Sequence, residues 1–312
     1  MITIYKTNQN NELEKLKKLE INSWIDMKNP TQEEILKIAS LTNIDVSLFT
    51  SVIDDEEVSR IEEHEDASLI IANYPYIENK ENKNKYNTLP IGIITNKEYL
   101  ITITIRKSLF LNDFRKGIAK DFYTFKKTRF IIEILYKISS EYLKCLVSIN
   151  KEIEDKESVL YHATKNKELI NLLDLEKSLV YFITSLKGNE VVLEKLSRGN
   201  ILNLYEEDMD LLEDAIIENR QGIEMANIYR DILTSTTDTY ATIISNNLNQ
   251  VMKFLAGITI VFSIPTMIAS FMGMNVSLGF LNNDSLAFIK IVVISILLSI
   301  VVAIILKRKN ML

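Results

Sequence analysis

The sequence predicts an α+β multidomain membrane protein, built from a cytosolic α/β domain, a long helical stalk and two C-terminal transmembrane helices. Three observations lead to this prediction. Helical and strand patterns are mixed over roughly the first 125 residues, only helical periodicity follows Lys126, and both long apolar runs lie after residue 250. We therefore expect an α/β domain at residues 1–125, a stalk at 126–250 and a transmembrane hairpin at 251–312.

The bulk composition limits the class of protein. The chain of 312 residues has a formal net charge of −6, so it lacks the basic excess expected of a nucleic-acid-binding protein. Its single cysteine, Cys145, cannot form an internal disulfide and indicates a reducing compartment. The first residues, Met1 to Lys6, lack the basic and then apolar pattern of a cleaved signal. We therefore expect the soluble part to be cytosolic.

Local signals define elements of the α/β domain. Thr31 and Glu34 have the spacing of a capping box, in which two side chains satisfy backbone amides at the start of a helix. Runs rich in β-branched and aromatic residues predict strands at 68–77, 89–95 and 98–104. The polar segment 78–87 separates the first two of these strands, and we expect it to be a mobile loop.

Long helices are predicted for the stalk. Apolar residues recur at helical spacing from Ile131 to Ile153 and from Leu172 to Leu196. A third helix, the long pore helix, begins near residue 205 and meets no proline before Pro265, so it would run from the cytosolic part into the membrane. A soluble coiled coil is the alternative, but here the apolar pattern continues directly into a segment of membrane-spanning length.

Two segments near the C-terminus are long and apolar enough to cross a bilayer, at about residues 252–273 and 286–306. The 19 residues from Phe254 to Met272 carry no charge, and the second run is broken only by Lys290, which can reach the membrane surface. Basic residues precede the first run and follow the second, whereas the segment between them has none, which places both termini in the cytoplasm. Buried core helices of a soluble protein are the weaker alternative, because both runs are charge-poor and of spanning length.

One face of the long pore helix, which includes the first span, is unusually polar for a helix that enters lipid. Small, polar or flexible side chains recur there at alternating steps of four and three residues, which keeps them on one side of the helix. They are Asp238, Thr242, Ser245, Asn249, Met252, Ala256, Thr259, Ser263, Thr266 and Ser270. Such a face should contact water or protein rather than lipid. Several copies arranged around an axis would enclose water, so the pattern indicates a channel subunit.

The tripeptide Gly273-Met274-Asn275 follows this span, just before a short outer loop and the second span. In that position it resembles the motif of the CorA family of divalent-metal ion transporters. Further segments are similar to the family's cytosolic domain and to its approach to the membrane: Trp24-Ile25-Asp26, Asn29-Pro30-Thr31, Asp54-Asp55-Glu56-Glu57, Arg60-Ile61-Glu62, Leu89-Pro90-Ile91-Gly92-Ile93-Ile94 and Asn249-Gln250-Val251-Met252-Lys253. The resemblance covers most of the chain.

This resemblance implies a homopentamer in the cell (inner) membrane, with the first span of each subunit lining a central pore. Gly273, Met274 and Asn275 would form the selectivity filter, with Asn275 at the outer mouth. Together, the polar face and the family imply these pore-lining residues: Asp238, Asn249, Met252, Leu255, Thr259, Ser263, Thr266 and Ser270. Met252 and Leu255 would make a hydrophobic constriction that blocks ions by excluding water.

Magnesium is the transported ion that the family implies. Mg²⁺ dehydrates reluctantly, so a ring of Asn275 amide oxygens can bind its water shell without removing it. Gly273 would permit the backbone conformation that ends the helix, and Asn275 could also be a simple helix C-cap. The intact Gly-Met-Asn motif favours magnesium over the related zinc-transporting branch. Co²⁺, Ni²⁺ or Zn²⁺ on the same scaffold is the alternative.

Two positions depart from the pattern of the family. Ser263 and Ser270 stand where some members have methionine and glycine, which implies a wider or more polar pore. The outer loop is also poor in acidic residues, which weakens any cation-collecting ring there.

The sequence offers no energy-coupling or catalytic motif. It has no phosphate loop, no paired carboxylates inside a span and no nucleophile motif, so we expect passive flow rather than an enzyme. Asp214 falls where the family has a regulatory carboxylate between subunits, and Glu78, in the polar loop, is the expected partner. Mg²⁺ bridging the two would stabilise a closed pentamer. A membrane-anchored sensor without conduction is the remaining alternative, but it gives no reason for the polar face.

Overall fold

The computed structural model describes residues 1–80, 83–106, 108–119, 122–160, 166–198, 201–202, 204–274, 286–309 and 311. The chain divides into two compact units, Met1–Thr236 and Thr237–Leu312. The elements confirm the predicted α+β class, with a mixed sheet, a long helix and two apolar C-terminal helices. The domain boundaries expected after residues 125 and 250 stay predictions.

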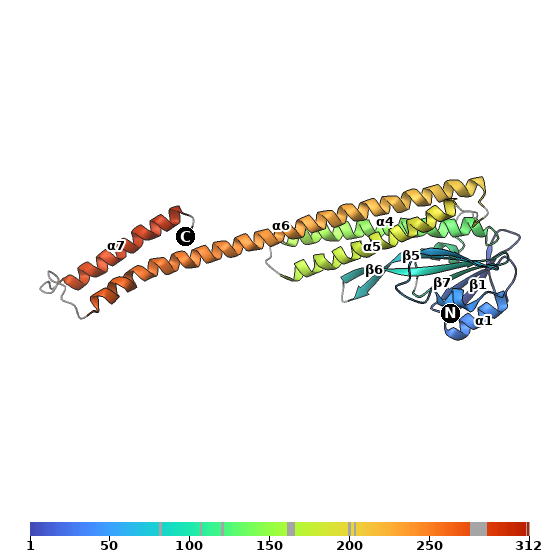
Figure 1. Ribbon diagram of the computed structural model, residues 1–312, viewed down its shortest axis with the longest axis horizontal. Helices are drawn as coiled ribbons and strands as arrows, with labels where there is room; N and C mark the ends of the chain where they lie inside the picture. Colours follow the sequence, from blue (N-terminus) through green and yellow to red (C-terminus); the bar gives the residue numbers. More distant parts are fainter. Residues whose placement is uncertain are drawn as a thin grey trace. The chain divides into compact units, whose positions relative to one another are not determined.

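A seven-stranded mixed sheet forms the centre of the first unit (Figure 1). Its spatial order is β2-β1-β3-β7-β6-β5-β4, and only β3 and β7 run parallel to each other. The strands are β1 Ile2–Thr7, β2 Leu13–Leu16, β3 Trp24–Lys28, β4 Arg60–Glu63, β5 Ser68–Lys80, β6 Lys83–Thr95 and β7 Leu100–Thr104.

Helices cover the sheet because alternate side chains of a strand point to opposite faces. Ile70 packs into the core shared with α4 (Lys127–Leu160) and α5 (Asn166–Arg198), whereas Ile71 packs toward α1 and α2. The other helices of this unit are α1 Gln32–Thr42, α2 Val46–Thr50, α3 Asn112–Arg115 and the first part of α6.

Two local features define the start of α1 and the packing of the segment after α2 against the sheet. The predicted capping box at Thr31 is confirmed, because both of its hydrogen bonds with Glu34 are formed at the start of α1. A Cβ atom at Gly92 would lie 2.3 Å from the side chain of Val52, so only glycine allows the segment after α2 to approach β6 this closely.

The expectation of a loop at residues 78–87 is wrong. β5 and β6 continue beyond the sheet as a two-stranded ribbon and remain paired out to Lys80 and Lys83. The ribbon contacts α4 and α5, and there Tyr86 is only 1% exposed and meets the ring of Phe182 edge-on. Burial of this tyrosine stabilises the strand pairing, which the polar composition of residues 78–87 does not indicate.

A buried ion pair between Asp26 and Arg115 links β3 to α3. Both nitrogens on one edge of the Arg115 guanidinium donate to the Asp26 carboxylate, at 2.8 and 3.1 Å. Asp26 is 1% exposed, and its neighbour Trp24 donates its indole N–H to the Thr102 hydroxyl. Cys145 is buried, and this burial raises the pKa of its thiol to about 12, so the thiol is neutral at physiological pH.

The second unit contains the later part of α6, from Thr237 onward, and all of α7. α6 (Glu206–Met272) begins at the predicted place and continues through Pro265, and α7 (Ala287–Arg308) follows. Each holds a window of spanning length, with mean hydropathy 1.9 and 3.1, of which only 6% and 11% is buried. Because a soluble core helix would be mostly buried, this exposure supports the prediction of two membrane spans.

Candidate functional site

The least exposed side chains of the membrane part of α6 lie on one face. They are Gly257, Ile258, Val261, Ile264, Pro265, Ile268 and Met272. On α7 the corresponding set is Ala287, Ile291, Ser295, Ser299, Val302, Ala303 and Leu306. Small residues in both sets are typical of helices that pack closely in a membrane. We infer from this lower exposure that the two faces turn toward each other within the second unit.

The predicted pore-lining residues lie on the other side of α6. At about 100° per residue, the face centred on Thr259, Ser263 and Thr266 is opposite the face that contains Val261 and Ile268. All eight predicted residues, from Asp238 to Ser270, are exposed in the single chain. The structure therefore brings them together on a face that the rest of the described chain leaves uncovered.

Hydroxyl groups on this face have a defined hydrogen-bonding role. Thr259 donates to the Leu255 carbonyl at 2.8 Å, Ser263 donates to Ile260 at 2.8 Å, and Thr266 donates to Phe262 at 3.0 Å. A hydroxyl has one donor and two acceptor lone pairs, so each oxygen still offers acceptors to the exposed side. Water molecules around a metal cation point their hydrogens outward. The face therefore suits the passage of a hydrated cation.

The predicted filter is only partly described. Gly273 and Met274 follow the end of α6, and Asn275 lies outside the described residues. α6 ends at Met272, just before Gly273, whose φ is not in the left-handed region and where a Cβ atom would lie 3.6 Å from its nearest neighbours, so the expected role of this glycine stays a prediction. Its amide still donates to the Ala269 carbonyl at 3.0 Å, so the backbone has not yet left helical geometry.

The two predicted regulatory carboxylates lie in different surroundings. Asp214 is exposed on α6, whereas Glu78 on β5 faces Arg106 at 3.8 Å and lines a pocket to which Asp214 does not contribute. Among the described residues, no group of three His, Cys, Asp or Glu side chains could hold a metal ion. Within the part of the chain that the structure describes, Asp214 and Glu78 are therefore not brought together.

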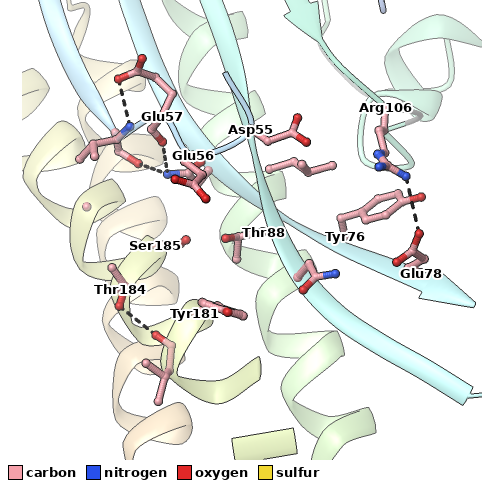
Figure 2. Close-up of a pocket in the computed structure, with 17 residues that line it drawn as sticks. Asp55, Glu56, Glu57, Tyr76, Glu78, Thr88, Arg106, Tyr181, Thr184 and Ser185 are labelled. Atoms are coloured by element: carbon pink, nitrogen blue, oxygen red, sulfur yellow. Dashed lines mark hydrogen bonds and ion pairs between the residues drawn. The ribbon is translucent and has the colours of Figure 1, made fainter. Parts of the chain in front are cut away.

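Sequence reasoning missed the pocket around Glu78. It measures about 580 Å³ and lies between the segment before β4, the β5–β6 ribbon and α5 (Figure 2). The Arg106 guanidinium lies 5.3 Å from the centre of the Tyr76 ring, and interactions with Tyr76 and then Glu78 raise the pKa of Arg106. The only sequence signal was the acidic run from Asp54 to Glu57, which reads equally well as a solvated surface.

Comparisons with known proteins agree with this arrangement. A sequence model of the family described as CorA-like Mg²⁺ transporter protein matches residues 20–308. The cobalt/magnesium transport protein CorA of Methanocaldococcus jannaschii is 30% identical over 296 residues, which cover 92% of this chain and 90% of that protein.

Solved structures show the same fold. The complete structure of the CorA magnesium transporter from Methanocaldococcus jannaschii covers 99% of this chain and 98% of its own, with a TM-score of 0.86 and 27% identity. The cytoplasmic domain of ZntB from Vibrio parahaemolyticus covers 79% of this chain and 97% of its own, with a TM-score of 0.61. At 12% identity, this second likeness concerns the fold alone.

Proposed function

Because the chain belongs to the CorA-like Mg²⁺ transporter protein family, we propose that it mediates passive, potential-driven uptake of Mg²⁺ across the cell (inner) membrane. The observation that carries this proposal is the polar face of α6, which is exposed and lies opposite the face assigned to α7. In a bilayer, hydroxyl and amide groups on such a face need water or protein beside them. A water-filled path enclosed by several copies meets that need.

The assembly that we propose is a homopentamer with both termini in the cytoplasm. In it α6 would line the pore, Met252 and Leu255 would form the constriction, and Gly273, Met274 and Asn275 would form the outer filter. Met252 and Leu255 are 59% and 53% exposed in the single chain, so both side chains are free to face an axis. Rings of such side chains can close a pore by excluding water.

The membrane potential supplies the driving force in this proposal. A doubly charged ion gains about 4.6 kcal/mol for each 100 mV on entering a negative interior. Co²⁺ is the second proposed cargo, because the related protein from Methanocaldococcus jannaschii is a cobalt/magnesium transport protein. Ni²⁺ or Zn²⁺ would fit the same scaffold, and comparing uptake of the four ions would rank them.

Asn275→Ala tests the filter. We expect Mg²⁺ uptake to fall at least about tenfold, equivalent to about 1.4 kcal/mol, because the outer ring loses its amide acceptors for the hydrated ion. The measurement is Mg²⁺ uptake in a strain without its own magnesium transporters. Asn283→Ala, an identical change in the same segment between the spans, is the matched control. Equal rescue by wild type and Asn275→Ala would remove Asn275 from the filter.

Asp214 is proposed to sense cytosolic Mg²⁺ together with a carboxylate of a neighbouring subunit, for which Glu78 is the candidate. We expect Asp214→Lys to mimic a bound cation and reduce uptake at low internal Mg²⁺, whereas Asp214→Ala should let uptake continue at high internal Mg²⁺. Proteoliposomes with controlled internal Mg²⁺ measure both. Asp210→Ala, an exposed acid one turn earlier on α6, should behave as wild type. An unchanged dependence on internal Mg²⁺ in Asp214→Ala would refute the sensor role.

A further inference from the structure

Within the first unit, α5 is held firmly on the sheet and α6 is held less firmly. α5 packs closely along β5 and β6, and its buried Asn189 is bonded to both backbone groups of Asn73 on β5. The Asn189 side chain accepts from the Asn73 amide at 2.8 Å and donates to the Asn73 carbonyl at 2.7 Å. The backbone of α6, by contrast, comes close to α4 or α5 at few points of the described chain. Few contacts therefore oppose a shift of α6 along its neighbours.

Small side chains follow one another on the buried face of α6. They are Ala215, Asn219, Gly222 and Ala226, and their spacing of four, three and four residues keeps them on one side of the helix. At Gly222 a Cβ atom would lie 3.3 Å from both terminal methyl groups of Leu186, so α5 and α6 are very close here. Helices fix their relative position by fitting ridges of large side chains into grooves. Over these three turns, shape alone therefore fixes the axial position of α6 weakly.

Asn219 is the polar member of this set, and its side chain is 0% exposed. Its Nδ2 donates to the Leu186 carbonyl on α5 at 2.9 Å. A hydrogen bond requires a particular distance and direction, so this bond distinguishes one axial position of α6 from its neighbours. A single buried asparagine fixes the register of paired helices in the same way in coiled coils, at a cost in stability.

That cost is visible at the other atom of the amide. Among the residues that the structure describes, no donor reaches Oδ1 of Asn219, although this atom is buried. Exchanging the two amide atoms would not remove the problem, because the oxygen would then face the carbonyl of Leu186, which is also an acceptor. A buried acceptor without a partner destabilises the fold. Leucine would fill nearly the same volume without this cost.

Polar contacts at the exposed edge of the two helices cannot replace this bond. Arg220 on α6 donates to Glu190 at 2.8 Å and to Glu194 at 3.0 Å on α5. The Arg220 side chain is 57% exposed, and ion pairs in water are weak and easily exchanged. Because one guanidinium already bonds to two successive turns of α5, this contact is also compatible with more than one axial position.

We propose that Asn219 fixes the register of the pore helix, which here means the axial position of α6 against α5. The bond to the Leu186 carbonyl selects one register, and the unsatisfied Oδ1 is the stability that this selection costs. α6 is one helix from Glu206 to Met272, so its register at Asn219 is carried along the helix to the polar face. The link to transport rests on the proposed function, in which the copies of α6 line a pore and must present matching rings.

A distance measurement in the full-length protein in detergent micelles tests this proposal. In a Cys145→Ala background, spin labels are attached after Lys177→Cys on α5 and Glu213→Cys on α6, both exposed positions, and the labelled chain is co-expressed with an excess of chains lacking both sites. Pulsed electron resonance should give one narrow distance with Asn219 present. With Asn219→Leu we expect a second component, shifted by about 5 Å, which is one helical turn. The thermal unfolding midpoint should be equal or higher, because no buried acceptor is left unpaired.

The matched control is Asn227→Leu. Asn227 is a partly buried asparagine two turns later on α6, but it donates to the Ile223 carbonyl of its own helix at 2.9 Å, so this variant should keep the single distance. Asn219→Ala is the second variant, which keeps the side chain small and should also show the shifted component. A single unchanged distance in both Asn219 variants, or the same second component in Asn227→Leu, would overturn the proposal. Because the readout is a distance, a failure of the transport proposal would not alter it.

Discussion

Thr266→Phe is expected to reduce Mg²⁺ uptake to the level of cells that lack the transporter. Thr266 lies on the exposed polar face of α6, near the middle of the predicted span. In the proposed assembly every subunit contributes this residue to the pore, so one substitution places a ring of aromatic side chains in the ion path. Such a ring fills the path and excludes water, and a hydrated ion then has no route.

A matched control separates blockage from poor membrane insertion. Val293→Phe on α7 adds nearly the same volume, because valine and threonine are almost isosteric, and Val293 is exposed outside the face assigned to the α6–α7 contact. We expect this variant to transport as wild type at equal expression. Normal uptake by correctly inserted Thr266→Phe would show that Thr266 does not face the path.

Arg115→Ala is expected to have the largest effect on folding, destabilising the α/β part by about 3–5 kcal/mol. The substitution leaves the buried Asp26 carboxylate with only the more distant and partly exposed Lys28 ammonium, at 3.8 Å, as a cation. It also removes the hydrogen bonds from Arg115 to the carbonyl and hydroxyl of Ser108. Trp24 is the chain's single tryptophan and lies two residues from Asp26, so its fluorescence during urea unfolding reports on this region directly.

The control for this prediction is an exposed ion pair. Arg198 is 80% exposed in its contact with Glu194, so Arg198→Ala should change stability by less than about 1 kcal/mol. Replacing both buried partners, as Asp26→Leu with Arg115→Met, should recover much of the lost stability because no unpaired charge remains. An unfolding midpoint in Arg115→Ala equal to that of wild type would contradict the importance of the pair.

Local patterns explain which elements the sequence could predict. The capping box at Thr31 depends on residues three positions apart, and the polar face of α6 depends only on helical periodicity, so both were predicted before any tertiary structure was known. The ribbon at residues 78–87 was missed because its pairing depends on burying Tyr86 against Phe182, almost one hundred residues later in the chain. Polar neighbours in the sequence concealed that contact.

The same distinction between local signals and contacts of residues far apart in the sequence applies to the sites. Asp26 and Arg115 are 89 residues apart, and nothing near either residue indicates the other as its partner. The pocket at Glu78 combines a loop, a ribbon and a helix, so no single segment displays it. At Gly273 the motif was recognised from the sequence, and the structure shows that its amide still donates to the Ala269 carbonyl. The roles of Asn275 and Asp214 depend on neighbouring subunits and remain predictions.

Cysteine accessibility tests the central claim most directly, that one face of α6 borders water inside the membrane. In a Cys145→Ala background, single cysteines at Thr259, Ser263, Thr266 and Ser270 are compared with cysteines at Val261, Ile264 and Ile268. A small water-soluble thiol reagent, applied at low Mg²⁺, reacts only where water supports the thiolate. The account predicts rapid labelling of the first set and protection of the second. Equal labelling of both sets, or protection of the polar face, would contradict it.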